Sequence, residues 1–139
     1  MLAKIKSSSV YEEKYSYSRA IVIGDWVLLA NTAGRNHATK VMPATALEQI
    51  KQTVENIEKA LRGAGAELDH IVRARIYIPN LEHHAEVLTW WGERFRGIDP
   101  VVTITACPLA SAEYLVEVEV TAYKGATPDA WTRAAVSLA

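Results

Sequence analysis

Two apolar, β-branched runs near the start of the chain are separated by a glycine-aspartate pair. The runs span residues 16–23 and 26–32, and Gly24-Asp25 divides them. Glycine readily adopts the positive φ angle that a two-residue hairpin turn requires. The pattern predicts a β-hairpin whose strands carry apolar side chains on both faces, because apolar residues occupy successive positions.

A stripe of apolar residues at alternating steps of three and four comes next. Its members are Leu47, Ile50, Val54, Ile57 and Leu61. This spacing is typical of an amphipathic helix. Thr45 and Glu48 predict a capping box at its start, in which Glu48 reaches back to the Thr45 amide. Gly63 and Gly65 mark its end.

The remaining elements complete an α+β order of ββαβαββ. Residues 71–78 alternate between apolar and polar and predict a strand. Asn80 is a candidate cap for a second helix that ends by Gly97. Two further strands are expected over residues 101–106 and 114–122, the latter with valines on one face and Glu117 and Glu119 on the other. Such a chain forms one five-stranded sheet with two helices.

Two helices can cover only one face of that sheet. The predicted hairpin nevertheless carries apolar residues on its second face, among them Ile21, Trp26 and Leu28. Most soluble oligomers are symmetric assemblies of identical chains. We therefore expect another copy of the chain to cover the second face.

Composition narrows the class of protein. The 139 residues are 50% hydrophobic, which is enough to form the core of one domain. We expect this domain to span residues 1–124. Residues 125–139 form a tail that is a candidate for docking on a neighbouring subunit. No apolar run is long enough to span a membrane, and no leader is evident, so a cytoplasmic protein is expected. With 15 basic and 16 acidic residues, tight nucleic-acid binding is disfavoured. No cofactor is indicated, and adjacent His83 and His84 give no metal-binding pattern.

The chain resembles the reactive-intermediate deaminases, the RidA or YjgF family, also known by an older endoribonuclease label. The resemblance runs from about Tyr15 to Lys124. It rests on the Gly24-Asp25 hairpin, the helix reading Gln52-Thr-Val-Glu-Asn-Ile-Glu-Lys-Ala-Leu with Ala64-Gly65-Ala66 after it, the 71–78 strand, and the closing Leu115-Val-Glu-Val-Glu-Val. It implies a chorismate-mutase-like fold, a homotrimer with a central barrel, small-molecule ligands in three clefts between subunits, and hydrolysis of imines or enamines.

The resemblance also implies residue roles. Glu117 matches the family's acidic residue that holds and activates water, and Tyr17 matches an aromatic residue of the cleft. Asn31 and Thr32 stand where relatives carry a small Ser-Gly pair. The family's carboxylate-binding Arg, in a Pro-Ala-Arg-Ser or Pro-Ala-Arg-Thr motif, falls on Val102 here. Valine offers no hydrogen-bond donor, so deamination of simple 2-imino acids is disfavoured.

The strand that contains Val102 admits two interpretations. The family spacing points Val102 and Ile104 at the cleft and Thr103 and Thr105 into the core, which gives an apolar pocket wall. A one-residue slip in the loop over residues 108–113 would instead turn both threonines towards the ligand. The apolar wall is the slightly favoured interpretation.

Several charged residues have both a structural and a functional interpretation. Glu117 and Glu119 are expected to face Arg73 and Arg75 as cross-strand ion pairs, and Arg75 beside Glu117 would lower the pKa of its carboxyl group. Arg19, on the same predicted strand face as Tyr17, either replaces the missing clamp or lies at the surface or a subunit interface.

Two functions of different classes remain. The first is an enzyme that hydrolyses or tautomerises an imine or enamine with a bulky substituent, with Glu117 positioning water. The alternative is a non-catalytic trimer that binds a metabolite or a protein in a degenerate cleft. A ribonuclease is disfavoured because isolated histidines, such as His37 and His70, are typically solvated or structural and provide no acid-base pair.

Overall fold

One six-stranded mixed sheet organises the chain, and the computed structural model describes residues 1–139. The elements in chain order are β1 (Leu2–Ile5), α1 (Val10–Lys14), β2 (Ala20–Ile23), β3 (Trp26–Ala33), α2 (Ala46–Gly63), β4 (Ile71–Tyr77), α3 (His84–Arg94), β5 (Val101–Thr105) and β6 (Glu117–Tyr123), with short 3-10 turns at Leu68–His70 and Leu81–His83. The strands lie in the order β1-β2-β3-β6-β4-β5, and only β4 and β5 run parallel.

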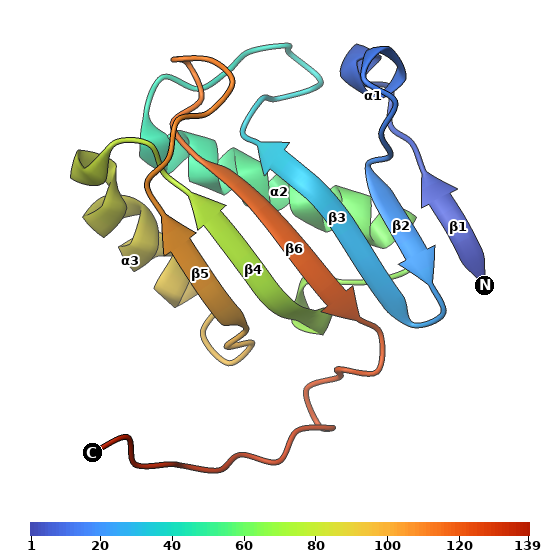
Figure 1. Cartoon of the computed structure of the whole chain (residues 1–139), viewed down its shortest axis with the longest axis vertical. Helices are drawn as coiled ribbons and strands as arrows, with labels where there is room; N and C mark the ends of the chain where they lie inside the picture. The colour runs from blue at the N-terminus through green and yellow to red at the C-terminus, as the bar shows by residue number, and fades with distance from the viewer.

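Helices α2 and α3 lie on the same face of the sheet, and its other face has no helix over it (Figure 1). The predicted apolar stripe of α2 faces this core, where Ile50, Ile57 and Leu61 are completely buried. The alternating valines of β6 are buried on the same side, whereas its glutamates face away. The expected α+β architecture with both helices on one face is therefore confirmed.

The turn between β2 and β3 and most of the N-terminal cap of α2 agree with the predictions from the sequence. Gly24 has a φ of +58°, and the two-residue turn pairs Ile23 with Trp26. The Thr45 hydroxyl accepts a hydrogen bond from the Glu48 amide at 3.2 Å, as predicted. The return half of the capping box is wrong: the Glu48 carboxylate accepts from the Thr45 hydroxyl at 3.0 Å instead of from the Thr45 amide.

The N-terminal segment contributes two elements that the sequence did not predict. β1 pairs with β2 and makes the sheet six-stranded instead of five-stranded. The predicted first strand begins at Ala20 and not at Ser16, because Ser16 has a φ of +57° and the Tyr17 amide donates to the Glu12 carbonyl oxygen at 3.1 Å. Tyr17 and Arg19 therefore lie on the connection between α1 and β2.

The side chains of β5 point as in the alternative interpretation. Val102 and Ile104 lie on the helix side, in register with buried residues of β4, and are 37% and 44% exposed. Thr103 and Thr105 lie on the opposite face, in register with Arg75 and its neighbours, so the favoured interpretation, with both threonines in the core and an apolar cleft wall, is wrong. The physical reason is that even the outermost strand turns its apolar side chains to the helix-covered side of the sheet.

The helix-free face carries the apolar side chains that the sequence placed there. Ile21, Ile23, Trp26 and Leu28 are all exposed on it, and the Trp26 ring packs on Tyr123 with centroids 4.8 Å apart.

The tail after Lys124 forms no helix or strand, and Arg133 donates to Asp99 of the same chain at 3.1 Å. None of the helices has both the length and the apolarity needed to cross a bilayer.

Candidate functional site

A cavity of about 440 Å³ lies beside the C-terminal end of β3 and the start of β6, and we call it the Glu117 cavity. The segment that contains α1 and the loop after β3 provide its other walls. Five of the predicted site residues line it: Tyr17, Arg19, Asn31, Thr32 and Glu117. Arg75, Val102 and Ile104 do not line this cavity of the single chain.

Glu117 is a half-buried carboxylate at the first position of β6. The Asn31 side-chain amide donates to its Oε2 at 3.3 Å, which orients the carboxylate. Burial raises the pKa of Glu117, and the positive charge of Arg19 opposes this shift only in part. A carboxyl group with a raised pKa holds a proton more readily than an ordinary glutamate, which suits it to general acid-base chemistry.

The expectation that Arg75 lies beside Glu117 and lowers the pKa of its carboxyl group is wrong, because the strand register pairs Arg75 with Glu119. Their side chains form the predicted cross-strand ion pair at 3.7 Å. The Tyr77 hydroxyl also donates to Glu119, and this hydrogen bond raises the pKa of Tyr77. Glu119 therefore has a structural role, and Glu117 is left free of an ion pair.

Arg19 lines the Glu117 cavity but is held by its neighbours. Its Nε lies 3.4 Å from Glu12, and its Nη1 donates at 3.3 Å both to the Thr32 hydroxyl and to the Asn31 carbonyl oxygen. The guanidinium also lies 5.8 Å from the centre of the Tyr17 ring. Arg19 is therefore a fixed part of the wall, so it is not a free replacement for the missing clamp.

The carboxylate of Glu12 anchors this wall, although no sequence pattern predicts this role. Glu12 is only 1% exposed, and it accepts hydrogen bonds from the Ser7 amide, at 2.8 Å, and from the Ser7 hydroxyl. Burial by itself raises the pKa of Glu12, but the Ser7 hydrogen bonds and the charge of Arg19 outweigh it and lower that pKa. One glutamate in a short polar segment carries no pattern that predicts burial.

Five hydrogen bonds of two α2 side chains, Gln49 and Asn56, position the segments that border the site. Gln49 donates to the Pro43 and Glu113 carbonyl oxygens at 2.8 and 2.9 Å and accepts from the Leu115 amide at 2.9 Å. Asn56 donates to the carbonyl oxygen of Ala33, at the end of β3, and to that of Arg35 in the loop that follows. Gly34 lies so close to the Gln49 backbone that a Cβ there would collide with it. These contacts with α2 fix the position of the loop after β3 and of the segment that leads into β6.

We expect Gln49→Leu to lower the free energy of unfolding by about 3 kcal/mol, because it leaves a buried amide and two carbonyls without partners. The measurement is urea denaturation followed by tryptophan fluorescence. Gln52→Leu is the control on the same helix, since the Gln52 side-chain amide donates only to Asn56. Equal losses in the two variants would show that Gln49 does not hold the loops.

Basic side chains gather on the loop wall of the Glu117 cavity. Arg35, His37 and Lys40 all line it, and His37 is exposed. Arg35 is tied to Glu113 at 2.7 Å. Burial lowers the pKa of His37, and the charges of Lys40, Arg19 and Arg35 lower it further. Sequence reasoning missed Lys40 because nothing in the loop fixes its direction.

The other histidines lie outside the cavity and have local roles. His70 accepts a hydrogen bond from the Glu67 amide at 3.0 Å, and His84 Nε2 lies 2.9 Å from the Ile78 carbonyl oxygen. No group of three His, Cys, Asp or Glu side chains in the structure is arranged to hold a metal ion.

Comparisons with known proteins agree with this fold. The sequence profile of the family described as Endoribonuclease L-PSP matches residues 9–124. A RutC family protein of Pyrococcus abyssi is 28% identical over 109 residues, which cover 78% of this chain and 86% of that protein. A Mycobacterium tuberculosis member of the YjgF/YER057c/UK114 family is 32% identical, with a TM-score of 0.80 over 88% of this chain and 99% of that one. A Rid family protein of unknown function from Yersinia pestis is 25% identical, with a TM-score of 0.78 over the same shares.

Proposed function

Because this chain belongs to the RidA/YjgF family, we propose that it is a small-molecule enzyme that hydrolyses or tautomerises an imine or enamine at Glu117. The observation that carries this proposal is the state of Glu117: a half-buried carboxylate with a raised pKa, oriented by Asn31 and facing a cavity. Such a group takes a proton from water and returns it within one reaction cycle.

The hydrolysis balances with water as the only co-reactant. The Glu117 carboxylate accepts a proton from a water molecule while the water oxygen bonds to the carbon of the imine in its protonated, iminium form, which gives a neutral carbinolamine. Glu117 then returns this proton to the carbinolamine nitrogen. The C–N bond breaks as the hydroxyl group releases its proton to solvent, a carbonyl forms, and ammonia or an amine leaves. For an enamine, protonation at carbon gives the imine first. Asn31 keeps the carboxylate aimed at the cavity throughout.

The walls of the Glu117 cavity favour a substrate with an aromatic or other bulky substituent over a simple 2-imino acid. Tyr11, Tyr17 and Tyr114 all line it and offer ring faces for packing. The position of the family's carboxylate-binding arginine is Val102, and Arg19 is already engaged with Glu12. No free guanidinium therefore replaces the carboxylate clamp.

We further propose a homotrimer with a central barrel, in which a second copy covers the helix-free face and completes the cleft. Four large apolar side chains exposed on this face support the assembly.

Leu28→Lys is expected to convert the trimer into monomers, because assembly would bury an unpaired ammonium group. Leu28 is 46% exposed in the single chain, so the monomer tolerates the lysine. Light scattering coupled to size-exclusion chromatography measures the mass. Leu81→Lys, on a different surface, is the control and is expected to keep the trimeric mass. An unchanged mass for Leu28→Lys would contradict this interface.

The test of the reaction is a panel of imines produced in situ from amino acids by an amino-acid oxidase. We expect faster hydrolysis of imines with aromatic substituents than of the small imine formed from alanine. Turnover of the small imine at an equal or higher rate would refute the proposed specificity. A ligand that binds and is recovered unchanged at high protein concentration would support the non-catalytic alternative.

A further inference from the structure

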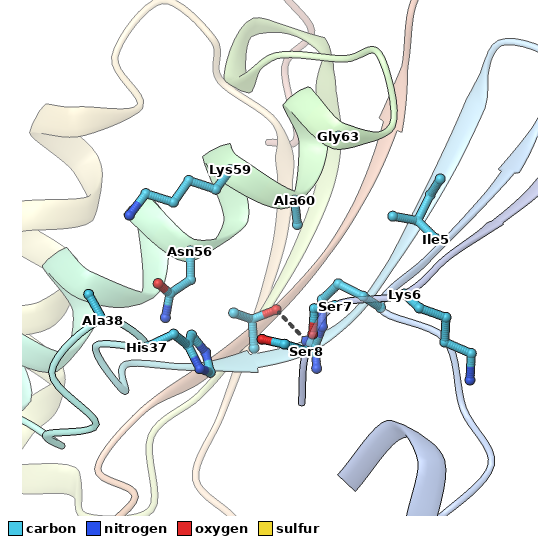
Figure 2. A pocket seen from close by; sticks show the side chains of 12 residues that line it. Ile5, Lys6, Ser7, Ser8, His37, Ala38, Asn56, Lys59, Ala60 and Gly63 are labelled. Atoms are coloured by element: carbon cyan, nitrogen blue, oxygen red, sulfur yellow. Dashed lines mark hydrogen bonds between the residues drawn. The ribbon is translucent and has the colours of Figure 1, made fainter. Parts of the chain in front are cut away.

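A second cavity, of about 320 Å³, lies between α2 and the segment that follows β1, and we call it the α2 cavity. Figure 2 shows Lys59 and Ala60 on its helical wall, Ser8 on the N-terminal segment and His37 on the loop after β3. It shares part of its wall with the Glu117 cavity, but Glu117 itself does not line it.

The charged residues that line the α2 cavity are all basic, although the chain has a net charge of −1. The cations Lys6, Arg19 and Lys59 line it together with His37, and no acidic residue does. Two of these cations are already engaged, since Arg19 pairs with Glu12 and the Lys6 ammonium donates to the Tyr17 carbonyl oxygen at 2.7 Å. Lys59 forms no ion pair or hydrogen bond within the chain.

Most of the charged side chains that act on His37 are positive. Besides burial, the charges of Lys40, Arg19 and Arg35 lower its pKa, and only Glu12 acts in the opposite direction. The His37 ring forms no hydrogen bond within the chain, so its neutral form still carries one N–H donor for a ligand. The Ser8 hydroxyl lines the same cavity and is also without a partner.

Three of the four carbonyl groups at the end of α2 have partners within the chain. A helix C-terminus carries partial negative charge on its last carbonyls. The Ala60 and Leu61 carbonyl oxygens accept from the Ala64 amide at 3.2 and 2.9 Å, and the Arg62 carbonyl oxygen accepts from the Gly65 amide at 3.0 Å. The basic side chains of the cavity therefore act against one free carbonyl, that of Gly63.

From these observations we infer that the α2 cavity binds the anionic group of a small molecule, a carboxylate or a phosphate. Lys59 supplies the charge, and His37 and Ser8 supply hydrogen bonds. The cavity volume of about 320 Å³ suits a metabolite-sized ligand. This inference does not depend on the reaction proposed at Glu117, because neither Lys59 nor Ser8 acts in that chemistry.

The test is an NMR titration of the full chain with sodium phosphate and, separately, sodium acetate at constant ionic strength. We expect saturable shifts of the Ala38, Ala60 and Gly63 amides, and a rise in the pKa of His37 when the anion is bound. Lys59→Gln should weaken binding about tenfold, as expected for the loss of one charge-assisted hydrogen bond. Lys51→Gln, the same change on the same helix but outside the cavity, should bind like the wild type.

The two anions separate the ligand classes. Saturation by phosphate alone identifies a phosphate site, saturation by acetate alone a carboxylate site, and saturation by both a general anion site. Each of these outcomes supports the inference when Lys59→Gln weakens binding and Lys51→Gln does not. Shifts that never saturate with either anion, or equal effects of the two lysine variants, would overturn it.

Discussion

Glu117→Gln is expected to lower the rate of imine hydrolysis by roughly 10²- to 10⁴-fold, the usual contribution of a general acid-base group. The amide keeps the shape of the carboxylate but cannot accept the proton of the attacking water. Glu119→Gln is the matched control, because Glu119 lies two residues along the same strand and its contacts are with Arg75 and Tyr77. Equal loss in both variants would remove Glu117 from the mechanism.

The pH dependence gives this variant a second signature. Burial raises the pKa of Glu117, so the wild-type rate is expected to fall on acidification at a higher pH than for an ordinary glutamate. A carboxyl group with a raised pKa stabilises the fold below its unfolded pKa and loses that stabilisation as pH rises through its folded pKa. Glu117→Gln should therefore unfold at a higher temperature than the wild type at neutral pH, with the difference shrinking in acid.

Glu12→Ala should lower the free energy of unfolding by about 3 kcal/mol, because removing one partner of a buried ion pair leaves the other uncompensated. Glu12 also accepts both Ser7 hydrogen bonds, so its loss should free the segment before α1. Urea denaturation at neutral pH measures the effect. Glu13→Ala, one residue along the same helix and without a side-chain partner, is the control.

Acid should diminish the difference between Glu12→Ala and the wild type. The pKa of Glu12 is lowered in the fold, so its stabilisation is present above its unfolded pKa and disappears as pH falls through its folded pKa. Arg19, no longer paired with Glu12, should also lower the pKa of Glu117 and move the acid limb of activity to lower pH. An unchanged unfolding free energy at neutral pH would show that Glu12 does not anchor the site.

The candidate site was predictable chiefly where a residue's place follows from its strand. The alternation of β6 correctly placed Glu117 and Glu119 on the helix-free face, and the strand order gave the Glu119–Arg75 pair. Tyr17 and Arg19 reached the Glu117 cavity although they are not on a strand. The mistaken pairing of Glu117 with an arginine arose because a shift of register moves every partner along the strand.

The sequence by itself determined the two long helices, most of the strands and the buried faces, because the spacing of apolar residues repeats with the period of each element. Tertiary structure alone decided the surroundings of the candidate site. Asn31 meets Glu117 across 86 residues of chain, and Gln49 meets Leu115 across 66. Such contacts, with the burial of Glu12, set the charge and orientation of the site, and no local repeat records them because they exist only once distant segments have packed together.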